Sequence, residues 1–458
     1  MFQRLLVANR GEVAVRIARA CRTLGIAPIG VFSEADRGAS WLSVFDESVC
    51  IGPGPASASY LRADRLVQAA LQTRASALHP GWGFLAENAR FAGLCAQHGV
   101  TFVGPTPALM DLMGTKTPAK RAMRAAGLAL IPGSDEPLAT LEEALACARA
   151  IGYPVLVKAD AGGGGRGMRR CADEGELREA FAAARAEAEA AFGDGSVYLE
   201  RYLERGRHVE VQLLCDAFGG GIHVGERECS VQRKHQKLIE ESPSPALAPA
   251  ERAALGAAAL RAALAVGYTS AGTVEFLRAA DGNLYFMEMN TRLQVEHPVS
   301  ELVSGLDVAA LQIRIAANER LPLAQAAVRF QGHAIEARIN AEDPERGFQP
   351  TPGTLRAFAL PTDLGPGTLR VDTHLCEGDE IPPHYDSLLA KVIAHADTRA
   401  AAIETLARAL GAARIEGVAT TIPLHLAVLA SEDFRSGQYD TGSIPGWPPA
   451  RAKTRVKA

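Results

Sequence analysis

The feature that most constrains this chain is an acidic β-hairpin predicted in its second half. The segment reads AGTVEFLRAADGNLYFMEMNTRLQVEHP, and we expect its turn at Asp281 and Gly282. Glu275 then lies opposite Glu288, with Cβ atoms ~5 Å apart on one face. Period-two alternation places Asn290 on the same face. Two carboxylates and an amide oxygen suit a hard ion such as Mg²⁺. A solvated acidic face is the alternative, but the flanking apolar residues favour a cleft.

Four polar residues follow the hairpin, namely Arg292, Gln294, Glu296 and His297. A guanidinium beside a carboxylate can bind a small oxyanion and take a proton from it. Taken alone, these residues fit an ordinary ion pair equally well.

A run of four glycines lies in KADAGGGGRGMR, the segment Lys158–Arg169. It contains G-x-G-x-x-G, but Met168 and the arginines after it predict a returning strand, where a dinucleotide site needs a helix. A glycine hairpin over nucleotide phosphates fits better, because glycine permits close backbone approach. Lys158 is placed to reach a phosphate oxygen. A flexible surface turn is the alternative interpretation.

The segment Gly225–Pro245 mixes charges of both signs. Such a cluster is typical of a solvated strand edge, although its basic side is a candidate for binding polyphosphate. Its charged residues are Arg227, Arg233, Lys234, His235, Lys237, Glu226, Glu228, Glu240 and Glu241.

Short apolar strands alternate with helical segments in the first hundred residues, which predicts a parallel sheet with crossover helices. Gly11 is the only glycine at the first strand-to-helix turn, so the dinucleotide fingerprint is missing. The expected strands are Leu5–Ala8, Pro28–Phe32, Ser48–Ile51 and Thr101–Val103, with helices beginning near Leu61 and Glu87. Later elements are expected as strands at Pro154–Ala159, Glu210–Leu214 and Gly221–Val224, and as helices at Glu176–Phe192, Glu251–Val266 and Ala400–Leu410.

Asp173 and Glu176 resemble a capping box at the start of the long helix. We expect the helix beginning at Ala400 to be the final one. The stretch from Gly442 is Pro-rich and then basic, and it is expected to be a loosely ordered terminus.

Composition excludes several classes of function. The 48 Lys and Arg against 52 Asp and Glu give a net charge of −4, without the basic excess that bulk nucleic-acid binding needs. No apolar run approaches a membrane span, and Arg4, Arg10 and Glu12 oppose a signal peptide. The eight cysteines are scattered singly, which favours free thiols. We expect a cytoplasmic protein without nucleic-acid or membrane partners.

These segments together resemble biotin carboxylase, the ATP-grasp component of biotin-dependent carboxylases of the acetyl-CoA carboxylase type. Nine motifs carry the resemblance, in the order of the family and over almost the whole chain. They are ANRGE (8–12), HPGWGFLAEN (79–88), MGTK (113–116), KADAGGGGRGMR (158–169), RHVEVQ (207–212), ERECSVQRKHQK (226–237), EMNTRLQVEHP (288–298), GHAIEARINAEDP (332–344) and HYDSLLAK (384–391).

The resemblance implies an α/β and α+β chain with an ATP-grasp fold. Residues 1–114 would form a Rossmann-like pre-ATP-grasp domain, and residues 115–318 the ATP-grasp domain with a glycine-rich lid at 131–203. Residues 319–446 would form the biotin carboxylase C-terminal domain, followed by a tail at 447–458.

The resemblance also assigns roles to single residues. ATP would be bound by Lys116, Lys158, Gly164, Gly165, Glu200, Leu203, His208, Gln232 and His235. Mg²⁺ or Mn²⁺ would be held by Glu275, Glu288 and Asn290, and bicarbonate by Lys237, Arg292, Gln294 and the backbone of Val295. Glu296 would be the general base, assisted by Lys237 and Arg292, and Arg338 would bind biotin and stabilise its enolate.

The implied reaction begins when Glu296 deprotonates bicarbonate, which attacks the γ-phosphate of MgATP to give carboxyphosphate. This breaks down to CO₂ and phosphate, phosphate removes the N1′ proton of biotin, and the ring nitrogen takes up CO₂. Biotin is expected on a separate carrier protein, because no lysine here has the flanking methionines of a biotinylation site. A separate carboxyltransferase and a homodimer are also implied, with a role in fatty acid biosynthesis.

Four positions depart from common family patterns: Trp82, Asp160, Ala161 and Ala390. Asp160 adds negative charge beside the glycine run, which predicts weaker ATP binding. Two alternative functions remain: another ATP-grasp ligase that joins an acyl phosphate to an amine, and a catalytically silent nucleotide-binding protein. The run from Arg292 to Glu296, together with Arg338, favours bicarbonate and biotin over the other ligases.

Overall fold

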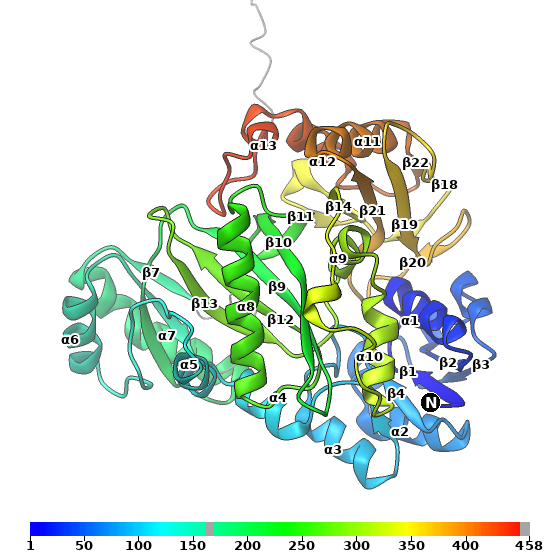
Figure 1. Cartoon of the computed structure of the whole chain (residues 1–458), viewed down its shortest axis with the longest axis horizontal. Coiled ribbons are helices and arrows are strands. Elements are labelled where there is room, and N and C mark those ends of the chain that lie inside the picture. Colours follow the sequence, from blue (N-terminus) through cyan, green and yellow to red (C-terminus); the bar gives the residue numbers. More distant parts are fainter. Residues whose placement is uncertain (161–167, 449–458) are drawn as a thin grey trace, which may run out of the picture.

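An N-terminal layer opens the chain. The computed structural model describes residues 1–160 and 168–448, and Figure 1 shows this layer in blue. Its five strands are parallel, in the order β3-β2-β1-β4-β5. The strands are β1 (Arg4–Val7), β2 (Ala27–Phe32), β3 (Glu47–Cys50), β4 (Ala77–His79) and β5 (Thr101–Phe102), and the helices are α1 (Gly11–Thr23), α2 (Ala63–Gln72), α3 (Ala89–Gln97) and α4 (Pro107–Gly114). The predicted alternation is confirmed, with element ends displaced by one or two residues.

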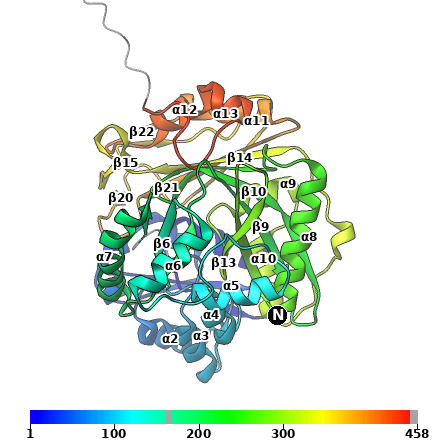
Figure 2. The ribbon, with the colours of Figure 1, turned by 90° about the vertical axis from the view of Figure 1, so that its left-hand side faces the viewer.

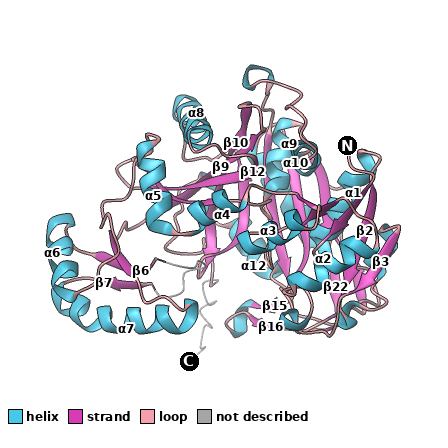
Figure 3. Ribbon diagram, turned by 90° about the horizontal axis from the view of Figure 1, so that it is seen from below, coloured by secondary structure: helices cyan, strands magenta, loops and turns pink. Residues whose placement is uncertain are grey.

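A small three-stranded unit projects from one side of the molecule, at the left of Figure 3. Its strands are β6 (Val155–Ala159), β7 (Arg169–Cys171) and β8 (Val197–Arg201), and its helices are α6 (Leu141–Ile151) and α7 (Glu174–Phe192). The returning strand predicted after the glycine run is β7, which pairs antiparallel with β6. The unit has its own apolar core, which includes Val157, Leu177 and Leu199.

The predicted capping box at the start of α7 is only half correct. Asp173 accepts the backbone N–H of Glu176 at 3.0 Å, as a cap should. The Glu176 carboxylate, however, accepts the N–H of Ala172 at 2.8 Å, one residue earlier than the box requires.

An eight-stranded antiparallel sheet forms the centre of the molecule, in the order β13-β12-β9-β10-β11-β14-β21-β19. Its strands are β9 (Arg207–Cys215), β10 (Gly221–Arg233), β11 (Gln236–Ser242), β12 (Ser270–Arg278), β13 (Leu284–Asn290), β14 (His333–Asn340), β19 (Thr368–Thr373) and β21 (Leu388–Ala396). The helices α5 (Lys116–Ala125), α8 (Pro249–Ala265), α9 (His297–Ser304) and α10 (Val308–Ala316) accompany it. The sheet crosses the domain boundary expected after residue 318.

The acidic hairpin has the predicted register but a different turn. Glu275 pairs with Glu288 and Thr273 with Asn290. The turn extends from Ala279 to Asn283, whose backbone carbonyl accepts the Ala279 N–H at 2.8 Å. With this turn the pairs nearest to it are shifted by one residue from the prediction, and Phe276 pairs with Phe286. A β-bulge between Glu275 and Phe276 then returns the glutamates to the predicted pairing.

The mixed-charge segment lies inside the sheet, contrary to the expected solvated edge. It forms β10 and β11, which are flanked by β9 and β14. Glu226, Glu228 and Arg227 are buried, as are Glu240 and Glu241. The charges tolerate burial because they pair with one another and with neighbouring strands.

The C-terminal part packs helices on the far end of the large sheet, at the top of Figure 2. The helix expected to be the last is α11 (Arg399–Ala412), but α12 (Ile422–Ala430) and α13 (Glu432–Ser436) follow it, so that expectation was wrong. The first of them is apolar almost throughout and the second has only five residues, so neither has a clear helical period. The small strands are β15 (Glu342–Asp343), β16 (Gln349–Pro350), β17 (Gly353–Thr354), β18 (Ala357–Ala359), β20 (Glu380–Ile381) and β22 (Arg414–Glu416). Of the expected loose tail, residues 449–458 lie outside the described residues.

Candidate active site

Glu296 lies at the centre of the candidate site, immediately before α9. Its side chain is fully buried. One carboxylate oxygen accepts a hydrogen bond from Lys237 Nζ at 2.7 Å, and the other accepts one from Arg338 Nη2 at 2.8 Å. Burial acts to raise the pKa of Glu296, but Lys237, Arg338 and the nearby Arg227 outweigh it and hold the pKa below its ordinary value. The structure therefore brings the predicted base together with two predicted cationic partners.

Lys237, on β11, connects three strands through its ammonium group. Nζ donates to Glu210 on β9, to Glu275 on β12 at 2.9 Å, and to Glu296. Burial opposes the charge, but the carboxylates raise the pKa of Lys237 well above its ordinary value. Lys237 stays charged, and its three donor hydrogens are fully used.

The predicted metal ligands share one face but make different contacts. Asn290 Nδ2 donates to Glu275 at 2.8 Å, and His208 Nε2 lies 3.1 Å from the same carboxylate. Glu288 instead accepts from Lys116 Nζ at 2.7 Å. Carboxylate and amide oxygens on one face form a donor set that suits Mg²⁺ or Mn²⁺.

His208 is held protonated by this acidic surrounding. Burial lowers the pKa of the imidazole, but the Glu275 carboxylate more than compensates, and the pKa rises to about 9. His208, Glu210 and Glu275 have ligand atoms within 4.8 Å of one another. The positive lysine and imidazole neutralise acidic groups that a divalent cation would otherwise balance.

Arg292 joins the site from the loop after β13. Its guanidinium donates to Gln294 Oε1 at 2.7 Å, to Asn290 Oδ1 at 3.2 Å and to Glu87 at 3.0 Å. Glu87 belongs to the N-terminal layer and was not among the predicted site residues. The contact therefore brings the N-terminal layer to the candidate bicarbonate pocket.

A second charged cluster lies on the three-stranded unit. Lys158 on β6 and Lys120 on α5 both donate to Glu200 on β8, which is buried. Burial acts against ionisation, but the two lysines lower the pKa of Glu200 to about 2. Lys120 was missed in the sequence, although it lies four residues after Lys116 on the same helix and so shares a face with it.

Three further predicted ATP residues lie near the end of β8 and at the hairpin of β10 and β11. Leu203 is half-buried after β8, and Gln232 pairs with Lys237 across β10 and β11. His235 lies in the two-residue turn between these strands, with φ of 67°. This left-handed conformation is costly for a residue other than glycine and is often found at functional sites. Gly164 and Gly165 lie outside the described residues, as does Ala161.

Lys391 is a central residue that sequence reasoning did not assign. It is fully buried on β21, its Nζ donates to the Val295 carbonyl at 3.0 Å, and it lies 2.9 Å from Glu12 on α1. Glu12 is the last residue of the motif ANRGE, and Lys391 is the last residue of HYDSLLAK. A single lysine within the apolar strand LLAKVIAHA was the available signal of a buried charge.

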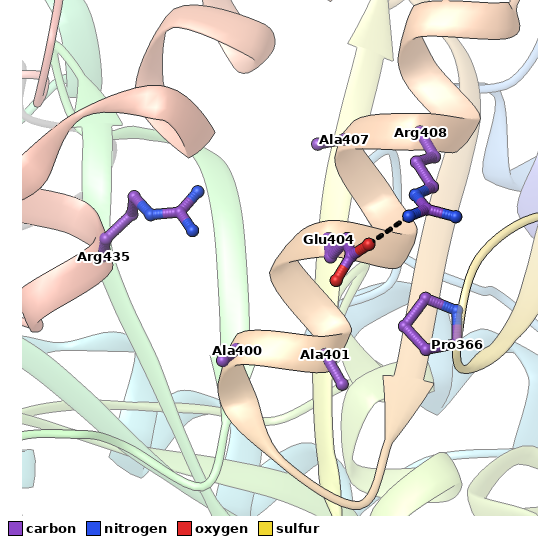
Figure 4. Close-up of a pocket in the computed structure, with 7 residues that line it drawn as sticks. All are labelled: Pro366, Ala400, Ala401, Glu404, Ala407, Arg408 and Arg435. Carbon is purple, nitrogen blue, oxygen red and sulfur yellow. Dashed lines mark hydrogen bonds and ion pairs between the residues drawn. The ribbon is translucent and has the colours of Figure 1, made fainter.

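The described part of the chain also holds a surface cavity of about 530 Å³ that is separate from these clusters (Figure 4). It lies along α11 and is lined by residues such as Pro366, Glu404 and Arg435. Glu404 and Arg408, one helical turn apart, form an ion pair at its wall. None of the predicted site residues lines it.

A large antiparallel sheet with a carboxylate–lysine cluster, joined to a small three-stranded unit, defines the ATP-grasp class of ligases. Family models match three successive parts of the chain: the biotin carboxylase N-terminal domain at 1–110, the carbamoyl-phosphate synthase L chain ATP-binding domain at 115–324, and the biotin carboxylase C-terminal domain at 336–445. The chain belongs to the biotin carboxylase family. The predicted family, fold class and ATP-dependent ligase class are confirmed.

Known relatives agree with this assignment. A biotin carboxylase of Nostoc sp. is 50% identical over 443 residues, covering 97% of this chain and 98% of the relative. The small subunit of 2-oxoglutarate carboxylase from Hydrogenobacter thermophilus is 48% identical over 448 residues, covering 98% and 94%.

A solved structure gives the same result. The biotin carboxylase domain dimer of Hydrogenobacter thermophilus 2-oxoglutarate carboxylase, in complex with MgADP, ADP and bicarbonate, has a TM-score of 0.93 and 48% identity, covering 96% of each chain. The prediction of a family that works with ATP, Mg²⁺ and biotin is confirmed. In the described residues, no helix is both long and apolar enough to span a membrane.

Proposed function

We propose that this chain carboxylates biotin on a separate carrier protein, using MgATP and bicarbonate. The observation that carries the proposal is the placement of Glu296, with one carboxylate oxygen on Lys237 and the other on Arg338. A base held between two cations faces two anion sites at once. One site suits bicarbonate, and the other suits an enolate.

Bicarbonate is proposed to enter beside Lys237, Arg292 and Gln294, with the Val295 backbone as a further contact. Arg292 now donates to Gln294 and Asn290, so these bonds must be exchanged for the anion. Glu296 is ionised and can accept the bicarbonate proton. The resulting dianion is stabilised by Lys237 and the guanidinium.

ATP is proposed to lie between the two charged clusters, with its phosphates on Lys116 and Lys158. The full proposed set includes Gly164, Gly165, Glu200, Leu203, His208, Gln232 and His235. Glu275, Glu288 and Asn290 would hold Mg²⁺ or Mn²⁺, which supplies charge neutralisation on the transferring phosphoryl group. Both lysines are now paired with glutamates, so phosphate oxygens would replace carboxylates as their partners.

Arg338 is proposed to stabilise the enolate of biotin after phosphate takes its N1′ proton. Arg338 lies on β14, and its guanidinium forms ion pairs with Glu296 and Glu240. A guanidinium keeps its charge in such a site, where an ammonium could lose a proton.

We further propose that the chain works as a homodimer in the cytoplasm, with a biotin carboxyl carrier protein and carboxyltransferase subunits. The final acceptor is proposed to be acetyl-CoA or a related acyl-CoA, for fatty acid biosynthesis. The domain division at residues 114, 318 and 446 is part of the same proposal. The support is the resemblance of nine motifs to biotin carboxylase, and the acceptor is the part of the proposal that the transferase experiment below decides.

The test is phosphate release from MgATP, with bicarbonate and free biotin omitted in turn. We expect release to depend strongly on both. Turnover should be lost in the double variant Glu275→Ala plus Glu288→Ala, because the charge on the phosphates is then unbalanced. Release that ignored biotin but responded to an amino acid would overturn the proposed function. Acetyl-CoA, pyruvate and 2-oxoglutarate, each supplied with its own transferase, test the acceptor.

A further inference from the structure

Two buried carboxylates face each other beside the candidate site. Glu240 on β11 is directly paired with Glu336 on β14, and both side chains are fully buried. The Cβ atoms of such opposed residues lie ~5 Å apart. Neither residue is among the proposed ATP, metal or bicarbonate ligands.

The two carboxylates are incompletely compensated. Within residues 1–160 and 168–448, none of the four oxygens of Glu240 and Glu336 has a hydrogen-bond partner. Arg338 Nη2 lies 2.5 Å from Glu240 Oε1 and 2.8 Å from Glu296 Oε2, so one nitrogen is shared by two carboxylates. Glu336 has no ion-pair partner within the same described residues. A buried ionised carboxylate without hydrogen bonds is strongly unfavourable.

The charged groups around the pair cannot neutralise two further anions. Arg338, on the strand of Glu336, already meets Glu296. Lys391 on β21 donates to the Val295 carbonyl and lies beside Glu12 and Asp372. Lys237 on β11 is shared by three carboxylates. Cys229 on β10 adds no charge, because burial raises the pKa of its thiol well above the ordinary value. His297 and Glu301 lie on α9, which packs on both strands.

The groups on α9 add no positive charge. Burial lowers the pKa of His297 well below its ordinary value, so the ring is neutral. Glu301 is paired with Arg16 and Arg370. If Glu240, Glu296 and Glu336 were all ionised, three negative charges would therefore surround the single guanidinium of Arg338.

A proton between the paired carboxylates resolves both difficulties. Like charges in one buried site favour the protonation of one member, and the acid can then donate to its ionised neighbour. Burial raises the pKa of Glu240 to about 7 in spite of Arg338. Burial also raises the pKa of Glu336 well above its ordinary value, and Glu240 adds to this effect.

We propose that Glu240 and Glu336 share one proton at neutral pH, and that this acid pair keeps the charge of Arg338 available for an anion. Both are positioning residues that act through Arg338. The second half of the inference rests on the proposed function, in which that anion is the biotin enolate. The first half does not depend on it.

The shared proton is tested by infrared spectroscopy of the full chain at neutral pH. We expect a protonated-carboxyl band that shifts in D₂O and disappears in both Glu240→Gln and Glu336→Gln. The matched control is Glu241→Gln, the next residue on β11, whose carboxylate is bonded to His333 and Arg399. It should keep the band.

Two outcomes overturn the shared proton. One is a wild-type spectrum without a D₂O-sensitive acid band at neutral pH, which needs no variant and so is independent of folding. The other is a band that survives in either glutamine variant. A band with the expected behaviour in a chain that does not carboxylate biotin would refute the proposed function and leave the shared proton intact.

The effect on Arg338 is tested by the pH profile of kcat/KM for biotin. In the wild type we expect a fall on the alkaline side as the pair loses its proton. In Glu336→Gln this fall should move upward by at least one pH unit, because the third negative charge cannot form. Glu336→Asp keeps an ionisable group and should retain the wild-type profile. Identical profiles in wild type and Glu336→Gln would overturn the role.

Discussion

The large sheet and the three-stranded unit use charged residues in opposite ways. In the large sheet the charges are inside, and a single ammonium such as Lys237 is shared by three carboxylates. On the helices of the three-stranded unit, ion pairs lie in solvent, as for Arg149 and Glu174, whose side chains are 62% and 36% exposed. The apolar core of this unit lies separately beneath them.

This difference in the burial of charges indicates which region is adapted to a chemical reaction. Exposed ion pairs contribute little to stability, since water already solvates both partners. Buried pairs lose that solvation, and well-packed apolar residues would often be as stable. The charged interior of the large sheet is therefore best explained by anion binding and proton transfer, whereas the small unit is built as an ordinary packed layer.

The largest expected effect concerns the base. Replacing Glu296 by Gln removes the proposed proton acceptor but keeps the shape of the side chain. We expect biotin-dependent phosphate release to fall by about 10²–10⁴-fold. Glu174→Gln on the small unit is the control and should leave the rate unchanged. If phosphate release by Glu296→Gln stayed within threefold of the wild-type rate, the proposed chemical role of the large sheet would be contradicted.

Arg227→Met tests the energetic side of the comparison. Arg227 is fully buried, and its guanidinium donates to Glu210 at 2.6 Å and Gln212 at 2.7 Å. Removing it leaves Glu210 with less compensation, so we expect a loss of about 3–5 kcal/mol in urea unfolding. Arg149→Met on α6 is the matched exposed change and should be indistinguishable from wild type. Equal effects of the two changes would contradict the comparison.

Glu200 is an exception to this comparison, because it belongs to the three-stranded unit but is buried against two lysines. Its pKa of about 2 is below the unfolded value, so its stabilising contribution is present above that value and is lost as pH falls through about 2. The contribution amounts to about 3 kcal/mol. We expect Glu200→Gln to flatten the acid decline of the unfolding free energy. An unchanged slope would show that the lysines do not hold this carboxylate.

Asp160 should give the smallest effect. The sequence suggested that its charge weakens ATP binding, but its carboxylate accepts the Thr117 N–H at 2.9 Å and the Thr117 hydroxyl proton near the start of α5. We expect Asp160→Ala to lose about 1 kcal/mol of stability, as for a lost helix cap. Asp160→Asn should keep most of it. A KM for ATP that improved strongly in Asp160→Asn would restore the original interpretation.

The sequence predicted local pairings well and distant ones poorly. Glu275 and Glu288 could be paired because a short hairpin links them, and even the unforeseen bulge leaves their register intact. Lys391 and Glu12 stand at opposite ends of the chain, and no spacing rule joins them. Their contact depends on how α1 packs beside the end of the large sheet, where β19 and β21 lie.

The burial of β10 and β11 was missed for another physical reason. A strand rich in both charge signs has the composition of a solvated edge, and only the neighbouring strands show that most of these buried charges lie beside an opposite charge. The roles of Glu240 and Glu336 likewise depend on the register between β11 and β14, which lie on either side of the expected boundary.

The continuity of the large sheet limits how the chain can be divided. A fragment ending near residue 318 would uncover β11, and a fragment beginning there would uncover β14, each with a row of unpaired backbone groups. Open edges of this kind invite aggregation through new strand pairing. Although the chain matches three family models, its last two parts should fold, and resist proteolysis, as one cooperative body.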